Sequence, residues 1–271
     1  MKYKCLSIAG FDGSGGAGIQ ADLKTFSALG CYGMTVLTAL PVQNTCGVKK
    51  CYSIPLKSIE EQLHALFEDI LPDSIKLGML FSSEIIEVVA SFLSKYAQNI
   101  PIVLDPVMLA KSGDALLLPE AVHSLKTKLI PLATLITPNI PEAYALVGED
   151  ENFSEIKLTE KLLALGSKAV LLKGGHAIGT TATDLLLEQN FQQQLFSASR
   201  IDSKNTHGTG CTLSAAICAF LAQGMALKKA CELAKKYLYH AMLAASEQSV
   251  GKGHGPVHHF YHLWPVNHEV I

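Results

Sequence analysis

The 271-residue sequence has no strong excess of charge and no long apolar run. Its formal net charge of -2 gives no general attraction to nucleic acid or anionic lipid, so an anionic ligand needs a local binding device. No apolar stretch approaches the roughly 20 residues of a membrane span. The apolar run within the opening MKYKCLSIAG is too short for a secretion signal. We therefore expect a cytoplasmic chain that binds neither membrane nor nucleic acid.

The cysteines form no recognisable metal or disulfide pattern. There are seven of them, an odd number, and they show neither C-x-x-C spacing nor a compact framework. Reduced thiols in a cytosolic compartment are typical of such a chain. We expect most of them to be small buried hydrophobes.

An acidic residue is also missing where one class of nucleotide-binding protein needs it. The segment GFDGSGGAGIQAD, residues 10–22, contains a full G-x-G-x-x-G between Gly13 and Gly18. A dinucleotide-binding fold also requires an acidic residue about 20 positions further on. No Asp or Glu lies between Asp22 and Glu60, which argues against that reading. A tight packing turn is the plain alternative, but Asp12 and Asp22 flank the loop as ligand-facing groups would.

Short apolar runs alternate with longer segments of helical periodicity, which predicts a mostly parallel α/β sheet with helices on both faces. Expected strands are residues 5–9, 35–40, 74–77, 102–104, 133–136 and 169–173, followed by a hairpin at 183–187 and 191–196. Expected helices are 19–29, 59–70, 84–96, 120–129, 154–165, 212–223 and 227–247. Ser58 and Glu61 resemble a capping box. No linker or repeat interrupts residues 1–271, so we predict a single domain.

A second glycine-rich segment, KNTHGTGCTLSAAI, begins at residue 204. Thr206, Gly208, Thr209 and Gly210 lead directly into an apolar helical pattern, whose first N–H groups have no intrahelical partner. Such donors suit a phosphate or the charge of a phosphoryl-transfer transition state. Cys211 falls in the first turn, where we expect a lowered thiol pKa.

Polar residues follow several of the predicted strands. Asp105 ends IVLD, and Asn139 and Glu142 in PNIPE offer oxygen ligands that suit Mg²⁺. Helix capping is the alternative for Asn139 and Glu142, and both roles can coexist. Lys173 opens KGGH as a phosphate contact or as a solvated charge at a strand end. The histidines of the tail lack the fixed spacing of zinc ligands, and we expect no metal site there.

Taken in order, several segments resemble the hydroxymethylpyrimidine/phosphomethylpyrimidine kinases of thiamine biosynthesis, within the ribokinase-like superfamily. They span the chain: AGFDGSGGAGIQADLKTFSALGCYG, LTALPVQNT, IKLGML, VLDPVMLAKSG, ITPNIPEA, LLKGGH, KNTHGTGCTLSAAI and GHGPVHHF. The resemblance implies a ribokinase-like fold and a homodimer. It also implies ATP- and Mg²⁺-dependent phosphorylation of 4-amino-5-hydroxymethyl-2-methylpyrimidine and then of its monophosphate.

The resemblance also assigns roles to residues. It places Gly10, Ala17, Asp22, Gln43 and Met79 at the pyrimidine, with Gln43 reading its amino edge and Asp22 near the hydroxymethyl group. It gives Thr206, His207 and Lys173 to the nucleotide phosphates and the metal to Asp105, Asn139 and Glu142. Gly208, Thr209, Gly210 and Cys211 become the catalytic segment, with Cys211 standing where the superfamily usually has Asp. Pyridoxine or pyridoxal kinase is the nearest alternative activity, and a catalytically silent ligand sensor is a more distant one.

Overall fold

The computed structural model describes residues 2–108, 113, 116–148, 153–174 and 179–264. A central sheet of eight strands runs through the molecule in the order β10-β9-β8-β7-β6-β5-β1-β2. Strands β1, β2, β5, β6, β7 and β8 are parallel, whereas β9 at one edge pairs antiparallel with both β8 and β10. The predicted α/β architecture is confirmed. That residues 1–271 form one domain stays a prediction.

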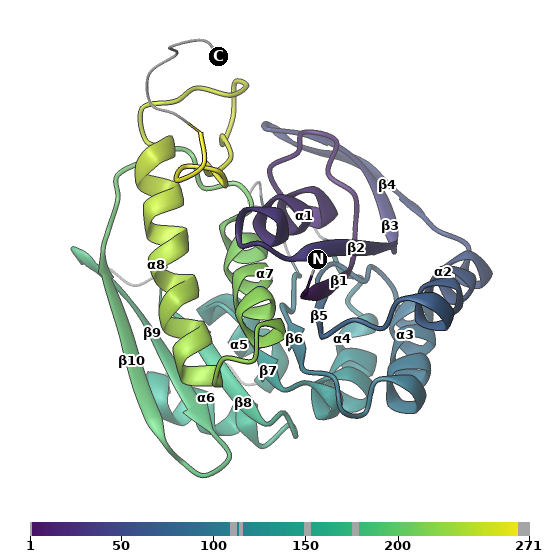
Figure 1. Cartoon of the computed structure of the whole chain (residues 1–271). Helices are drawn as coiled ribbons and strands as arrows, with labels where there is room; N and C mark the ends of the chain where they lie inside the picture. Colours follow the sequence, from purple (N-terminus) through teal and green to yellow (C-terminus); the bar gives the residue numbers. More distant parts are fainter. Residues whose placement is uncertain (1, 109–112, 114–115, 149–152, 175–178, 265–271) are drawn as a thin grey trace.

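The strands of the central sheet are β1 (Lys4–Ala9), β2 (Tyr32–Leu37), β5 (Ser74–Leu77), β6 (Ile102–Leu104), β7 (Leu135–Ile136), β8 (Ala169–Lys173), β9 (Thr181–Glu188) and β10 (Gln193–Ser199). Helices α1 (Gly18–Ala28), α7 (Thr209–Ala222) and α8 (Leu227–Ala245) cover one face. The other face carries α2 (Leu56–Asp69), α3 (Ser83–Tyr96), α4 (Ala121–Ser124), α5 (Ile140–Val147) and α6 (Glu155–Leu163) (Figure 1).

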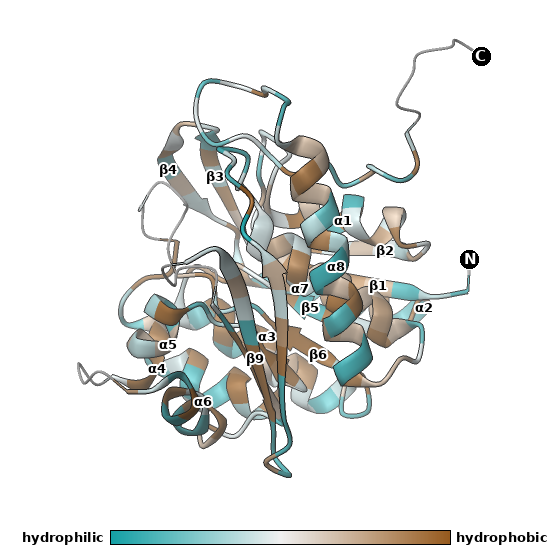
Figure 2. Ribbon diagram, turned by 90° about the vertical axis from the view of Figure 1, so that its left-hand side faces the viewer, coloured by the Kyte–Doolittle hydropathy of each residue, from teal (hydrophilic) through white to brown (hydrophobic). Residues whose placement is uncertain are grey.

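Alternating strand residues feed two separate apolar cores, one on each face of the sheet. In β8, Val170 and Leu172 join the core under α2 to α6, and Ala169 and Leu171 join the core under α1, α7 and α8. Burial on both faces explains why these strands read as continuous apolar runs. Figure 2 shows the same pattern as brown strands beneath helices with mixed brown and teal surfaces. Among the described residues, no helix is both long and apolar enough to cross a membrane.

The expected strand at 35–40 is wrong in extent, because the chain leaves the central sheet at Thr38. The Thr38 backbone N–H donates to Ala9 O at 3.1 Å, and its hydroxyl donates to Met79 O at 2.6 Å. These bonds turn the chain into a separate two-stranded sheet of β3 (Ala39–Asn44) and β4 (Gly47–Ser53), which the sequence analysis missed. This hairpin carries Gln43 over the end of the main sheet.

Three helix predictions also need correction. The predicted capping box at Ser58 is wrong, since α2 begins at Leu56 and Ser58 lies inside it. The expected helix at 120–129 passes from α4 into a π-helical turn at Leu125–Leu129. The last long helix pair starts earlier than expected, because α7 begins at Thr209. The third correction places the second glycine-rich segment directly at a helix N-terminus.

Candidate active site

A cavity of about 920 Å³ opens at the carboxyl ends of the parallel strands, where ligands of open α/β sheets bind. It brings together nearly all of the site residues expected from the sequence. These are Gly10, Ala17, Gln43, Met79, Asp105, Asn139, Glu142, Lys173, Thr206, His207, Gly208, Thr209, Gly210 and Cys211. Asp22 is the exception, because its side chain lies behind the wall of the cavity and is fully buried.

Asp12 organises the first glycine loop. Its carboxylate is fully buried and accepts the backbone N–H groups of Gly16 at 3.0 Å and Ala17 at 2.7 Å. The Ser14 hydroxyl donates to its other oxygen at 2.7 Å. The expectation that Asp12 faces a ligand is therefore wrong, since its oxygens are used within the loop. Although burial opposes it, hydrogen bonding from His207 and Ser14 holds the pKa of Asp12 below its usual range.

Glycine is required where this loop enters α1, close to the end of β1. Gly18 opens α1 with φ +57, and a Cβ there would lie 2.4 Å from Gly10 O. A Cβ on Gly10 would in turn lie 2.8 Å from the sulfur of Met79. The glycines thus let the loop and Met79 pack closely at the predicted pyrimidine end of the cavity.

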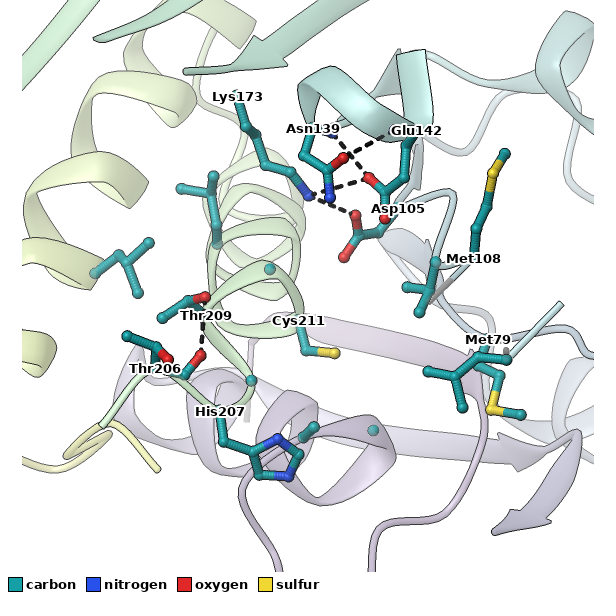
Figure 3. A pocket seen from close by; sticks show the side chains of 18 of the residues that line it. Met79, Asp105, Met108, Asn139, Glu142, Lys173, Thr206, His207, Thr209 and Cys211 are labelled. Atoms are coloured by element: carbon teal, nitrogen blue, oxygen red, sulfur yellow. Dashed lines mark hydrogen bonds and ion pairs between the residues drawn. The ribbon is translucent and has the colours of Figure 1, made fainter. Parts of the chain in front are cut away.

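The second glycine loop locks into the first. Gly208 has φ +77, and a Cβ on it would lie only 1.7 Å from Gly16 O. The neighbouring His207 places Nε2 2.7 Å from Asp12 Oδ2. Figure 3 shows the His207 ring turned toward the N-terminal loop, away from Asp105 and Lys173. His207 lines the cavity as expected, but its ring nitrogen serves the contact between the loops.

Helix α7 presents free backbone donors to the cavity. Gly208 is its N-cap and supplies no capping side chain. Within the described part of the chain, no acceptor is recorded for the N–H groups of Gly210 and Cys211. Thr209 is held by its hydroxyl, which donates to Thr206 O at 3.1 Å. The open end of this helix can therefore bind an anion, as the sequence predicted.

The Cys211 sulfur points into the cavity between Asp105 and Met79 (Figure 3). Burial raises the pKa of its thiol to about 11, while the nearby Lys76 ammonium acts in the opposite direction. The expectation of a lowered pKa at the helix N-terminus is wrong, because loss of hydration outweighs the helix and the lysine. The other cysteines either are buried or lie in the β3–β4 hairpin. Cys46 in this hairpin is exposed, so it is not one of the small buried hydrophobes that were expected.

Asp105, at the end of β6, meets residues of α5 and β8. Lys173 Nζ lies 2.9 Å from Asp105 Oδ1 and 3.9 Å from Glu142 Oε2 (Figure 3). Burial raises the pKa of Glu142, opposed by Lys173. Burial lowers the pKa of Lys173, but Asp105 and Glu142 outweigh it and raise that pKa overall. Lys173 is thus a charged group shared by two carboxylates, not a solvated strand end.

The capping alternative for Asn139 and Glu142 is present in full. Asn139 Oδ1 accepts the Glu142 N–H at 2.9 Å, and Glu142 Oε2 accepts the Asn139 N–H at 2.8 Å. This capping box starts α5 and fixes both side chains at the mouth of the cavity.

These oxygens fit Mg²⁺ but do not enclose it. No group of three His, Cys, Asp or Glu side chains within the described ranges is arranged to hold a metal. Mg²⁺ is commonly held by one or two carboxylates together with waters and substrate phosphates. Asp105 and Glu142 supply such a pair beside the open end of α7.

Two lysines that line the cavity, the buried Lys76 and the half-buried Lys235, were not identified from the sequence. Lys76 of β5 is fully buried and lines the cavity, with Nζ 2.8 Å from Asp22 Oδ2. Lys235 of α8 pairs with Asp184 of β9 at 2.7 Å, and Asp184 also accepts the Gly174 N–H at 3.1 Å. A charged residue inside a short apolar strand, as in SIKL, was the available signal for Lys76.

The tail of the chain packs against the second glycine loop and the turn of the β3–β4 hairpin. The Gly255 carbonyl accepts the His207 N–H at 3.0 Å, and the His254 N–H donates to Thr45 O at 3.0 Å. His259 is buried against the Thr212 hydroxyl of α7 at 3.1 Å, and burial lowers its pKa to about 3. The tail histidines thus sit in packing and backbone contacts around the hairpin and α7.

Comparison with known proteins agrees with this geometry. Residues 12–258 match the family model described as phosphomethylpyrimidine kinase. A curated hydroxymethylpyrimidine/phosphomethylpyrimidine kinase of Escherichia coli is 49% identical, over 97% of this chain and 99% of its own. The crystal structure of phosphomethylpyrimidine kinase from Clostridium difficile is 46% identical with a TM-score of 0.78, over 89% and 99% of the two chains. An ADP complex of Bacillus subtilis pyridoxal kinase is 37% identical with a TM-score of 0.87, over 96% and 98%.

Proposed function

Because the chain belongs to the phosphomethylpyrimidine kinase family and is a phosphotransferase of hydroxymethylpyrimidine and its monophosphate, we propose that ATP is its phosphoryl donor. The relative solved with ADP supports this choice. The triphosphate would reach the open end of α7 from the side of Thr206 and Lys235. The pyrimidine would occupy the end formed by Gly10, Gln43 and Met79.

The single observation that carries the proposal is the position of Cys211. Its sulfur and the free N–H groups of the α7 first turn face one cavity, between the predicted pyrimidine end and the buried carboxylates. A hydroxymethyl oxygen placed there attacks the γ-phosphorus, and the bond from that phosphorus to the bridging oxygen breaks. The Cys211 thiol releases its proton to water before the step, its thiolate takes the hydroxyl proton, and ADP leaves.

Charge stabilisation should contribute more than proton removal, because phosphoryl transfer passes through a largely dissociative transition state. The N–H groups of Gly210 and Cys211 would bind the equatorial oxygens of the transferred group. Lys173 would neutralise charge from the side of Asp105 and Glu142. The N–H groups are fixed in the first turn of α7, and Lys173 is fixed by its bond to Asp105, so these donors are in place before a ligand binds.

We propose that Asp105 and Glu142 hold Mg²⁺, with Asn139 fixing Glu142 through the capping box. When bound, the ion neutralises phosphate charge and orients the triphosphate. The ion pair with Lys173 holds the Asp105 carboxylate in place.

The test is a Cys211→Ala variant assayed with the pyrimidine alcohol, ATP and Mg²⁺. We expect turnover to fall on the order of 10²-fold or more, the range for loss of a general base, with pyrimidine affinity close to normal. Cys46→Ala, which removes an exposed thiol on the hairpin turn, is the matched control. Unchanged turnover in Cys211→Ala would refute the role given to this thiol.

Pyridoxal kinase is the alternative activity, since a pyridoxal kinase superposes on this chain with a TM-score of 0.87. Side-by-side turnover of the pyrimidine alcohol, its monophosphate and pyridoxine measures the preference. We expect the two pyrimidines to be the better substrates. We also propose that the protein is cytoplasmic and forms a homodimer. Light scattering of the purified chain tests the homodimer.

A further inference from the structure

Residues 250–256 lie between the β3–β4 hairpin and the second glycine loop. They follow α8 and carry the motif GHGP at 253–256, which takes no part in the proposed reaction. Figure 1 shows the tip of the hairpin beside this part of the chain, near the end of α8. We call residues 250–256 the strap.

The strap holds the tip of the hairpin by two hydrogen bonds. The backbone N–H of His254 donates to Thr45 O at 3.0 Å, and the backbone N–H of Gly253 donates to Thr45 Oγ1 at 3.2 Å. Thr45 lies in the turn between β3 and β4. A Cβ built on Gly253 would overlap Thr45 O, so glycine lets the two backbones meet here.

The base of the hairpin is held separately by the first glycine loop. The Phe11 N–H donates to Ala39 O at 3.0 Å. Pro41 and Gln43 line the cavity between this base and the tip. Because an isolated two-stranded hairpin is at best marginally stable in water, the position of Gln43 depends on the attachments at both ends.

The strap also holds the segment that leads into α7. The Gly255 carbonyl accepts the His207 N–H at 3.0 Å, directly before the N-cap Gly208. The buried Asn205 amide donates to Gln248 O at 2.7 Å, just ahead of the strap. A Cβ on Gly255 would overlap Asn205 Oδ1. The hairpin tip and the entry to α7 are thus bonded to neighbouring peptide groups of the strap.

The composition of the strap argues against a role in the apolar core. Val250, Lys252 and His254 are exposed, and three of the other four residues are glycines or proline in contact with the loops. Its recorded contacts are mainly backbone hydrogen bonds, which fix geometry on two sides rather than bury apolar surface. A segment of this kind suits the relative positioning of the two structures that it joins.

We propose that the strap and Thr45 position Gln43 relative to the first turn of α7, so that binding of the pyrimidine alcohol strengthens binding of the nucleotide phosphates, and the reverse. The proposal deepens the proposed function and rests on it, because it takes the α7 turn as the phosphate site. Such coupling is reciprocal, so either ligand can be used to measure it.

Conformational entropy provides the physical link. An alcohol that contacts Gln43 restricts the hairpin, and the strap passes this restriction on to His207 and the N–H donors that follow it. The nucleotide then meets a segment that is already ordered and loses less conformational entropy when it binds.

The test changes single contacts of the strap. Thr45→Val removes the hydroxyl that accepts the Gly253 N–H and keeps the branched shape, whereas Thr45→Ser keeps the hydroxyl. Gly253→Ala places a methyl group against Thr45 O, and Lys252→Ala, at the exposed neighbouring position, is its control. Calorimetry measures Kd of the pyrimidine alcohol for each protein, with and without Mg²⁺ and the ATP analogue adenylyl imidodiphosphate.

We expect the analogue to tighten alcohol binding about 5-fold or more in wild type, Thr45→Ser and Lys252→Ala, as is usual for coupled sites. Thr45→Val should lose most of this gain, since one hydrogen bond changes an affinity by about 5-fold. Gly253→Ala should lose all of it. Thermal unfolding of each variant confirms that it is folded.

Hydrogen exchange of the peptide 204–211 gives a second readout, which needs no nucleotide. The alcohol alone should slow exchange there about 5-fold or more in wild type and Thr45→Ser, but not in Gly253→Ala. A strap that serves stability alone would not transmit this effect, and every folded variant would then resemble wild type.

The proposal is overturned if Gly253→Ala keeps the wild-type gain in alcohol affinity, or if wild type binds both ligands without any gain. It is also overturned if the variants lose thermal stability and alcohol binding together. Failure of the proposed function looks different: an analogue that binds without protecting residues 204–211 lies elsewhere. The protection given by the alcohol alone would still report whether the strap links the hairpin to α7.

Discussion

Gly208 and Gly16 touch backbone to backbone, although they belong to glycine loops at opposite ends of the sequence. A Cβ on Gly208 would lie 1.7 Å from the Gly16 carbonyl oxygen, and Gly208 also has φ +77. The two loops that the sequence presented as separate motifs are therefore one interlocked structure. Its rigidity places the α7 N-terminus beside the predicted pyrimidine end of the cavity.

Gly208→Ala should separate the two loops and abolish most activity. Gly224→Ala is the matched control, because Gly224 has φ +82 but open space around its Cβ position. The control should lose only the left-handed backbone strain, about 1–2 kcal/mol. We expect Gly208→Ala to lose about 2 kcal/mol more in urea unfolding, in the range of overpacked cores. Equal losses in the two variants would contradict the interlock.

Gln43→Met should weaken recognition of the pyrimidine. Gln43 lines the cavity from β3, and the carboxamide offers a donor and an acceptor to the amino edge of the ring. Loss of two hydrogen bonds at about 1 kcal/mol each predicts a fall in kcat/KM of about 30-fold. Val42→Thr, on the exposed face of the same strand, should leave kinetics unchanged. A wild-type kcat/KM in Gln43→Met would exclude this contact.

Asn139→Ala should reveal two roles, whereas Ser154→Ala should reveal one. Asn139 caps α5 and Ser154 caps α6, so each loss should reduce the free energy of unfolding by about 1 kcal/mol. Asn139 also holds Glu142, a proposed Mg²⁺ ligand, and loss of such support typically weakens metal binding about 10-fold or more. Titration of activity with Mg²⁺ measures the difference. An identical Mg²⁺ requirement in both variants would leave Asn139 as a cap alone.

His259 should make the protein less stable below neutral pH. Its folded pKa of about 3 lies below the ordinary histidine value, so the unfolded chain binds the extra proton. The contribution of neutral His259 is complete above about pH 6.5 and is lost as the pH falls, by about 2 kcal/mol at pH 5. Urea unfolding at pH 7.5 and pH 5 should show a smaller drop for His259→Gln than for wild type. A drop of the same size in both would assign the effect to other groups.

Local sequence patterns predicted most of the sheet, and every predicted site residue except Asp22 lines the cavity. Residues 74–77, 102–104 and 169–173 form strands with the expected bounds, because short, mostly apolar runs are typical of a sheet covered on both faces. The β3–β4 hairpin was missed, although Asn44 and Gly47 bound its turn and the Asn44 side chain accepts the Cys46 N–H at 2.9 Å.

The sequence was least informative for side chains whose surroundings are formed by several helices and strands. The pKa of Cys211 depends on burial between β5, β6 and α1 as well as on its helix, and burial prevails. Asp22 was placed beside the substrate because nothing in the sequence pairs it with Lys76, 54 residues away. Such contacts arise from the packing of elements and leave no periodic signal along the chain.

The hydrogen bond between Asp12 and His207 joins residues 195 positions apart. During synthesis on a ribosome, the first glycine loop emerges long before the second. The contact between the two loops therefore cannot form until the second loop has been made. Non-local contacts of this kind form late in folding. An amino-terminal fragment that ends before residue 208 therefore lacks the α7 N-terminus and cannot complete this contact between the two glycine loops.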